Sequence, residues 1–429
     1  MNIPRRTFLL GLAAVPATSA WRREPLEAYA ARRRALAAAV GDGVIVLLGY
    51  DEYLGQSGYS SFRQESHFYY LTGHNEPGAA LVIAPQRNGE PYVETLFVPD
   101  DNDHTSKWLG PRLSVDDAGD LGADEVLPVS KLDSQVRTLL RDRKRLYGLL
   151  PNGPGRDRNA AEILLARLQG IGRRKDVRDI RTNVARQRAI KSASEIELIQ
   201  QAVDASIEGH LAAWKLIRPG SSEHQVAAAM VGATMSAGCE RMAYPPIVGG
   251  GPNSTILHYD RNESRFNAGE VVLMDVGGEY GHYAADITRT VPIGGRFTDR
   301  QRKVYDLVLG AQRAAIAAVK PGTELNGHGP SGLTGIVERY FKRHGEPGIG
   351  SKFTHGLGHQ VGLDVHDPSP PTDELKPGMV FTIEPGLYLP DEGFGVRIED
   401  MVVVTEDGAR VMTERLPKDP DKIEASMAA

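Results

Sequence analysis

The chain is poor in cysteine, in clustered basic charge and in long apolar runs. Cys239 is the one cysteine among 429 residues, which excludes an intramolecular disulfide bond and a cysteine-based zinc site. The formal net charge of −5 comes with no basic block suited to nucleic acid, and we expect the three arginines at residues 32–34 to lie on a solvated helix face. The apolar stretch from Phe8 to Val15 is too short to span a bilayer, so we expect no stable membrane insertion.

The remaining composition is that of a soluble globular protein, with 41% hydrophobic and 24% charged residues. A chain of 429 residues is too long for one ordinary hydrophobic core. We therefore expect two domains, at residues 21–183 and 184–429, with a basic stretch at residues 181–191 where they meet.

Residues 1–20 have the features of a targeting signal. Arg5 and Arg6 precede the short apolar stretch, and small residues follow up to Ala20. PRRTFLL resembles the twin-arginine export signal of bacteria, which implies export of the folded protein to the periplasm. Folding in the reducing cytoplasm before export agrees with the single cysteine. The alternative is a hydrophobic tail that stays uncleaved.

The first domain alternates predicted strands and helices, which favours an α/β fold. We expect a helix from residue 24 to about 39 and a strand in GVIVLLG. FYYLTGHNEPGAALVIAP predicts a strand, a Gly/Pro turn and another strand, and ETLFVPD predicts one more.

The second domain contains two comparable long helices. The first follows Ser192 or Ser194, either of which could be its N-cap, and stops before Arg218 of an Arg-Pro-Gly sequence. The second covers residues 299–319 and also ends in Lys-Pro-Gly. Because each helix is followed by strands, we expect an internal two-fold repeat. The fold class is therefore α/β (α+β) in two different domains.

Four carboxylates interrupt two pairs of apolar strands in this repeat. Asp275 and Asp286 flank a Gly-rich turn in VVLMDVGGEYGHYAADITRTVPI, and a hairpin centred between Tyr280 and Gly281 places them directly opposite each other. In GMVFTIEPGLYLPDEGFGVRIEDMVVVT, folding about Asp391 and Glu392 places Glu384 opposite Glu399.

Facing carboxylates need a compensating charge. Like charges opposite each other destabilise a strand pair, and unpaired buried carboxylates cost more. Two divalent cations would balance the four negative charges, so the pattern predicts a dinuclear metal centre. The alternative is that these acids are solvated strand ends or partners of structural arginines.

A histidine cluster in THGLGHQVGLDVHDP adds nitrogen ligands: His355, His359 and His366. His359 and His366 would point to opposite faces of one unbroken strand. If both reach the site, the backbone must bend between them, and Gly362 is the expected place. Imidazole together with carboxylate favours a first-row divalent metal.

The motifs of the second domain resemble those of the pita-bread metallopeptidases, in particular the aminopeptidase P and prolidase group. IVGGGPNSTILHY, HGLGHQVGLDVHD, TIEPGLY and VRIEDMVVVT carry the resemblance together with the first acidic hairpin. It implies a pita-bread catalytic domain with five metal ligands, of which Asp286 and Glu399 would bridge two ions. The implied ligands are Asp275, Asp286, His359, Glu384 and Glu399.

The first domain carries a second resemblance. FRQESHFYYLTGHNEPGAALVIAP is similar to a segment of the creatinase-like N-terminal domain of aminopeptidase P. KWLGPRL, with Trp108, is similar to the stretch of that domain which reaches a neighbouring subunit's active site. The resemblance therefore implies a homodimer or homotetramer.

The resemblance also implies roles for individual side chains. Glu384 would act as general base, and His258 and His366 would contact the substrate and the tetrahedral intermediate. His355 would lie at the edge of the substrate pocket. Arg397 would be a countercharge behind the ligands, since it shares strand parity with Glu399, and Tyr388 could shape a proline pocket.

The implied activity is that of an exported Xaa-Pro aminopeptidase, which uses metal-activated hydroxide on peptides with proline at position two. Manganese is the metal implied, with cobalt or zinc as alternatives. A prolidase, which cleaves only Xaa-Pro dipeptides, is the alternative enzyme. A non-catalytic binding protein on this fold is a further alternative, against which the five intact ligand positions argue.

Overall fold

The computed structural model describes residues 22–52, 62–87, 91–99, 107, 110, 112–117, 122–150, 158–172, 176–369 and 374–428. The expected signal at residues 1–20 and the residue Trp108 lie outside these ranges. None of the helices in the described ranges is both long and apolar enough to cross a membrane.

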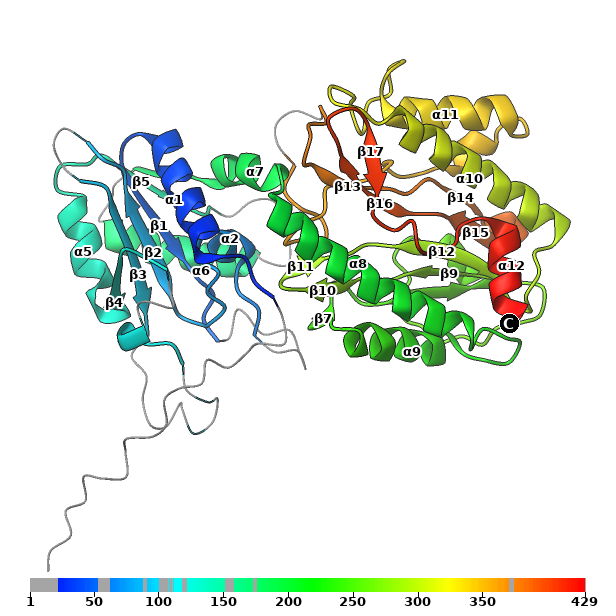
Figure 1. The fold of residues 1–429 in the computed structure, drawn as a ribbon, viewed down its shortest axis with the longest axis horizontal. Coiled ribbons are helices and arrows are strands. Elements are labelled where there is room, and N and C mark those ends of the chain that lie inside the picture. The colour runs from blue at the N-terminus through cyan, green and yellow to red at the C-terminus, as the bar shows by residue number, and fades with distance from the viewer. Residues whose placement is uncertain are drawn as a thin grey trace, which may run out of the picture.

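The N-terminal domain has three layers, with a mixed six-stranded sheet of order β4-β3-β2-β1-β5-β6 between helices (Figure 1). Strand β1 is buried on both faces, because Val44 and Val46 pack on the side of α5 and α6 while Ile45 and Leu47 pack on the side of α1 and α2. The elements are α1 (Leu26–Val40), β1 (Val44–Leu48), α2 (Ser66–Thr72), β2 (Ala80–Ala84), β3 (Val93–Val98), η1 (Val115–Asp117), β4 (Glu125–Pro128), η2 (Val129–Lys131), α5 (Leu132–Leu139), β5 (Arg145–Gly148), α6 (Arg158–Gly172) and β6 (Asp176–Asp179).

The expected strand in FYYLTG is wrong, since this segment forms helix α2. The Glu65 side chain accepts a hydrogen bond from the Phe68 amide at the start of the helix, and Gly73 ends it with left-handed backbone. All seven residues of α2 are buried. Capping and tertiary packing thus override the strand preference of an aromatic run.

The solvated arginine face expected at residues 32–34 is also wrong for two of its three members. Arg32 pairs with Glu24 and Glu195, and the side chain of Arg33 is 1% exposed and lies 2.6 Å from Glu94. Both guanidinium groups therefore join α1 to segments distant in sequence.

The C-terminal domain repeats one arrangement of two helices followed by strands. α8 packs against α9 and α10 against α11, and the strands lie between the two pairs in Figure 1. Ser192 is the N-cap of α8 in a capping box with Glu195, and Thr298 caps α10 in the same way. Both predicted helices are confirmed, and they end at Trp214 and Ala318, before the Arg-Pro-Gly and Lys-Pro-Gly sequences.

The bounds of the helices from residue 181 onward are α7 (Arg181–Ala189), α8 (Ala193–Trp214), α9 (Glu223–Ser236), η3 (Gly251–Thr255), α10 (Asp299–Ala318), α11 (Leu333–His344), η4 (Ile349–Lys352), η5 (Pro390–Glu392) and α12 (Pro420–Ala428). The expected domain boundary between residues 183 and 184 falls within α7, which lies between the two domains in Figure 1.

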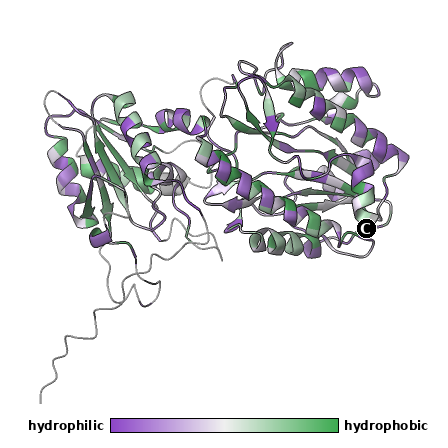
Figure 2. Ribbon diagram, in the orientation of Figure 1, coloured by the Kyte–Doolittle hydropathy of each residue, from purple (hydrophilic) through white to green (hydrophobic). Residues whose placement is uncertain are grey.

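The strands of this domain form small antiparallel sheets with the orders β11-β10-β7, β12-β9-β8, β13-β16-β17 and β14-β15. Hydrophobic residues concentrate along the strands of both domains, as Figure 2 shows. The strands are β7 (Arg241–Met242), β8 (Ile247–Gly250), β9 (Val271–Asp275), β10 (Gly278–Tyr280), β11 (Tyr283–Ala284), β12 (Thr288–Pro292), β13 (Val380–Ile383), β14 (Gly386–Leu389), β15 (Phe394–Arg397), β16 (Asp400–Val404) and β17 (Ala409–Val411).

Candidate functional site

The first acidic hairpin brings Asp275 and Asp286 together, but not in the expected register. Asp275 lies opposite Thr288, so the direct pairing with Asp286 is wrong. The turn is formed by Gly281 and His282, which have φ angles of 59° and 70°, as in a two-residue type I′ turn. Compared with the expected hairpin, this turn moves the centre by one residue. The residue opposite Asp275 therefore moves by two, from Asp286 to Thr288. A shift of two keeps the same face of the strand toward the site.

The second acidic hairpin has the register that the sequence predicts. Gly386 pairs with Arg397 in β14–β15, and Ile383 pairs with Asp400 in β13–β16. Glu384 therefore lies across from Glu399 in the gap between these two ladders. The side chain of Glu384 is 17% exposed, whereas Glu399 is buried.

The histidine segment crosses the same space. His359 and His366 stack with ring centroids 3.8 Å apart, so both side chains reach one site, as expected if the chain bends between them. Residues 362–366 form that bend. His359 Nδ1 lies 3.1 Å from the Gln360 carbonyl oxygen and donates its hydrogen there, which directs Nε2 toward the carboxylates.

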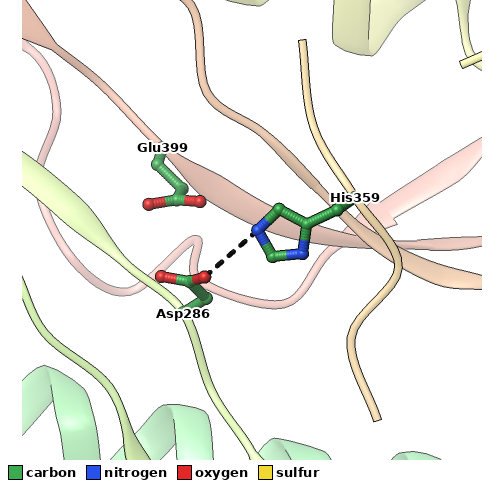
Figure 3. Close-up of side chains that lie close together, drawn as sticks. All are labelled: Asp286, His359 and Glu399. Atoms are coloured by element: carbon green, nitrogen blue, oxygen red, sulfur yellow. Dashed lines mark ion pairs between the residues drawn. The ribbon is translucent and has the colours of Figure 1, made fainter. Parts of the chain in front are cut away.

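Three side chains converge closely enough to share a cation. Single ligand atoms of Asp286, His359 and Glu399 lie within 4.8 Å of one another. Figure 3 shows the imidazole and the two carboxyl groups pointing toward a common space, with His359 Nε2 3.3 Å from Asp286. Glu384 is 3.6 Å from the same nitrogen. Three of the five expected ligands therefore converge on one point, and Glu384 lies next to His359.

The fifth expected ligand, Asp275, joins this group through a tyrosine. The Tyr244 hydroxyl lies 2.6 Å from Asp275 Oδ1 and 2.6 Å from Asp286 Oδ1. One hydroxyl hydrogen can serve only one of these carboxylates at a time. The sequence does not predict Tyr244, because a tyrosine before Pro245 in a loop carries no signal of a site.

The electrostatics show carboxyl groups that lack positive charge. Burial, together with the nearby carboxylates, raises the pKa of Asp286 and of Glu399, and burial raises the pKa of Glu384 to about 7. Burial acts in the same direction on Asp275, but the Arg397 guanidinium holds the pKa of that carboxyl below its usual range. Contact with Asp286 outweighs burial and raises the pKa of His359 to about 9.

This donor set fits divalent cations. Four carboxylates and one imidazole with its Nε2 directed inward are ligands of first-row metals. A cation would replace the protons that the raised pKa values imply. Asp286, His359 and Glu399 are placed to hold one such ion, and the expected ligands Asp275 and Glu384 lie next to them.

Arg397 connects the ligands to the pocket wall. Its Nη2 lies 2.6 Å from Asp275, and its Nη1 donates to the Tyr388 hydroxyl at 2.9 Å. Tyr388 lies 2.8 Å from His355 Nε2, while His355 Nδ1 lies 2.8 Å from the Gly356 carbonyl oxygen. His355 is thus the neutral tautomer with hydrogen on Nδ1, and burial lowers its pKa to about 4.

A cavity of about 470 Å³ opens onto these groups. Its walls combine the acids with the imidazoles of His258, His355 and His366 and with apolar side chains such as Ile247, Leu257 and Val365. His258 is exposed after η3, and burial together with neighbouring His359 lowers the pKa of His366 to about 4. Tyr388 is buried behind the wall and reaches the cavity through His355.

Comparison with known proteins agrees with the fold and the site. Residues 197–406 match metallopeptidase family M24, and residues 29–147 match the N-terminal domain of aminopeptidase P. The Xaa-Pro aminopeptidase of Escherichia coli strain K12 is 35% identical over 403 residues, which cover 86% of this chain and 89% of that protein.

Two solved structures share the whole two-domain architecture. Proline aminopeptidase P II from Yersinia pestis superimposes with a TM-score of 0.83 at 34% identity, covering 94% of this chain and all of that one (100%). Zn-substituted Escherichia coli aminopeptidase P in complex with product gives a TM-score of 0.85 at 31% identity, covering 95% and 99%.

An α/β domain followed by a duplicated helix and strand unit with an acidic, histidine-containing centre defines a metal-dependent hydrolase. Within that class, the chain belongs to metallopeptidase family M24, in its aminopeptidase P group, and is a metallo-aminopeptidase.

Proposed function

We propose that the chain is a dinuclear Xaa-Pro aminopeptidase, which frees the N-terminal residue of peptides that have proline second. The convergence of Asp286, His359 and Glu399, with ligand atoms within 4.8 Å of one another, carries the proposal. Two relatives that match most of the chain are named Xaa-Pro aminopeptidase, and this supports the proposed substrate class.

Two divalent cations, when bound, would lower the pKa of a water molecule and polarise the scissile carbonyl. The chain's own groups do the rest. Glu384 lines the cavity, where its carboxylate can take a proton from water. Its carboxylate lies 3.9 Å from His355 on the wall of the same cavity.

His258 and His366 line the same cavity and carry N–H donors, so they are suited to the oxyanion that forms at the scissile carbonyl. An Xaa-Pro bond has no N–H on its nitrogen and restricts the preceding residue. Recognition of such a bond must therefore rest on shape, and the apolar wall of Leu257 and Val365 offers one.

The test is product analysis with two substrates. The purified chain is supplied with Mn²⁺ and offered an Xaa-Pro dipeptide and an Xaa-Pro-Xbb tripeptide, and products are identified by mass. Release of the first residue from the tripeptide supports the proposal. Cleavage of the dipeptide alone would make the enzyme a prolidase, and cleavage of neither with metal bound would refute the proline assignment.

Manganese is proposed as the native metal, with cobalt or zinc as the alternatives for the same ligands. The oxygen-rich donor set supports it, whereas a site selective for zinc commonly has more nitrogen or sulfur. Metal analysis of the protein purified without added metal, followed by reconstitution with each ion separately, decides among them.

Export by the twin-arginine route is proposed from PRRTFLL alone. The test replaces Arg5 and Arg6 with lysine and follows the protein in periplasmic and cytoplasmic fractions. Retention of the variant in the cytoplasm supports the proposal, and unchanged export rejects it.

A dimer or tetramer is proposed from the resemblance of KWLGPRL to the stretch that reaches a neighbouring active site. Light scattering after size exclusion measures the mass of the assembly. Trp108→Ala should lower tripeptide cleavage if that stretch completes a neighbour's pocket, and a monomeric, fully active enzyme would reject the proposal.

A further inference from the structure

The segment that carries His366 has no regular secondary structure of its own. Residues 362–367 bend back so that the Asp367 amide donates to the Gln360 carbonyl at 2.8 Å. The Asp367 carboxyl group lies beneath Gly362, where an added Cβ would be 2.7 Å from it. The bend contains a second aspartate, Asp364. The position of the His366 imidazole therefore depends on the groups that hold Asp364 and Asp367.

Arg188 holds both aspartates. Its Nη2 lies 2.7 Å from Asp364 Oδ2 and 2.6 Å from Asp367 Oδ1. The side chains of Arg188 and Asp367 are each 1% exposed, so this ion pair is out of water. Lys191 adds a second cation at 3.2 Å from Asp367. Arg188 and Lys191 belong to α7 and the residues just after it, between the two domains.

The N-terminal domain also contacts the bend at residues 362–367. The Ser66 hydroxyl donates to Asp364 Oδ1 at 2.7 Å, and Arg63 Nη2 donates to the Leu363 carbonyl at 2.5 Å. Arg63 also pairs with Glu279 of β10 at 2.8 Å. His67 Nδ1 lies 2.5 Å from Arg188 Nη1 and accepts its hydrogen. The bend is thus held from the N-terminal domain and the α7 region together.

We infer that Arg188 is a positioning residue for His366, and that Ser66 and Arg63 make this positioning depend on the contact between the domains. None of these three side chains lines the cavity, so all act through the bend. The inference rests on the proposed function only in assigning His366 a role toward the substrate.

The first experiment compares Arg188→Met with Arg33→Met. Arg33 is a matched control, because its side chain is also 1% exposed and pairs with a buried carboxylate, Glu94, but it does not contact the bend. We expect tripeptide cleavage per folded molecule to fall about 100-fold in R188M, as for a displaced reacting group, and to change less than about threefold in R33M. Arg188→Lys should recover part of the loss, since it restores one charge but not the fork.

A double-mutant cycle with His366→Ala separates positioning from general structural damage. If Arg188 acts through His366, R188M should reduce the residual activity of H366A by less than about threefold. An equal loss in both backgrounds would overturn the inference. Ser66→Ala removes the hydrogen bond from Ser66 to Asp364 and the one from Arg63 to Ser66, and it leaves the buried charges. It provides the same cycle if R188M does not fold.

Hydrogen exchange gives a readout that does not need activity. Peptides covering residues 360–369 should exchange faster in R188M and in S66A, and no faster in R33M. Unchanged exchange of these peptides in R188M and S66A would reject the inference, whatever the activity of the variants. Faster local exchange in a protein that cleaves no Xaa-Pro peptide would instead reject the proposed function and keep the structural link.

Discussion

The Arg397 guanidinium, on β15 of the second acidic hairpin, lies 2.6 Å from Asp275, which ends β9 of the first. One cation thus joins the two halves of the repeat at the ligands. It also donates from Nε to the Thr288 hydroxyl at 3.1 Å, and that hydroxyl donates to Glu399.

Arg397→Met should therefore weaken metal binding. Without the guanidinium, the pKa of Asp275 rises, and protons compete better with the metal. We expect a loss of about 10- to 100-fold in Mn²⁺ affinity, measured by competition with a chelator. Arg397→Lys keeps the charge and should lose less. Equal affinity in wild type and R397M would contradict the role assigned to the contact.

Metal binding should release protons at neutral pH. Without metal, His359 with a pKa of about 9 is charged at pH 7, Glu384 with a pKa of about 7 is half protonated, and Asp286 and Glu399 also have raised pKa values. Ligation requires the deprotonated forms, so apparent affinity rises with pH until about pH 9. Calorimetry in buffers of different ionisation enthalpy measures the released protons, and a count of zero at pH 7 would refute the site's charge state.

Glu384→Gln should lower kcat by about 10²- to 10⁴-fold, the usual contribution of a general base. Glu392→Gln is the control on the same hairpin, because that carboxylate is exposed and pairs with Arg300. We expect E392Q to keep wild-type kcat. Metal content must be measured in both variants, since Glu384 is also a proposed ligand, and a fully metallated E384Q of normal kcat would exclude the assignment.

Gly277→Ala should destabilise the first hairpin beside its two acids. A Cβ at residue 277 would lie 1.9 Å from the Ala285 carbonyl oxygen, a backbone atom that cannot move without opening the turn. We expect an overpacking loss of about 1–3 kcal/mol or more in the free energy of unfolding. Gly232→Ala is the control, because its Cβ on α9 meets nothing within 4 Å, and there we expect a gain of up to about 1 kcal/mol.

His210 should make the fold less stable in mild acid. Burial lowers its pKa to about 4, and Nε2 lies 3.2 Å from the Val276 carbonyl oxygen. Between about pH 6.5 and pH 4, His210 is protonated in the unfolded chain but neutral in the folded chain. Its contribution to the free energy of unfolding is therefore complete above about pH 6.5 and falls by about 1.4 kcal/mol per pH unit below that. Denaturant unfolding of the metal-free chain at pH 7.5 and pH 5 should show a smaller loss in His210→Gln, and identical losses would contradict it.

The features that the sequence predicts correctly depend on neighbours in the chain. Helices α8 and α10 begin at capping boxes, which involve residues three apart. The register of the second hairpin follows from folding two apolar strands about the acidic pair Asp391 and Glu392. For this reason the chain sequence alone is enough to pair Glu384 with Glu399.

The wrong or missing predictions concern features that depend on residues distant in sequence or on unusual backbone angles. His282 has a positive φ, which a non-glycine residue seldom adopts, so the sequence pattern places the turn of the first hairpin one residue early. Arg33 is buried because Glu94, in another element, receives it. Tyr244 lies between Asp275 and Asp286 only through the tertiary fold.

The chain of contacts from Asp275 through Arg397 and Tyr388 to His355 has one consequence for proton movement. A guanidinium keeps its hydrogens at every pH that a folded protein survives. No proton can therefore pass along these contacts from the ligands to His355, and the hydrogen bonds fix the positions of the side chains without carrying protons. Protons exchanged during turnover must therefore take another route, and the cavity that Glu384 lines offers one.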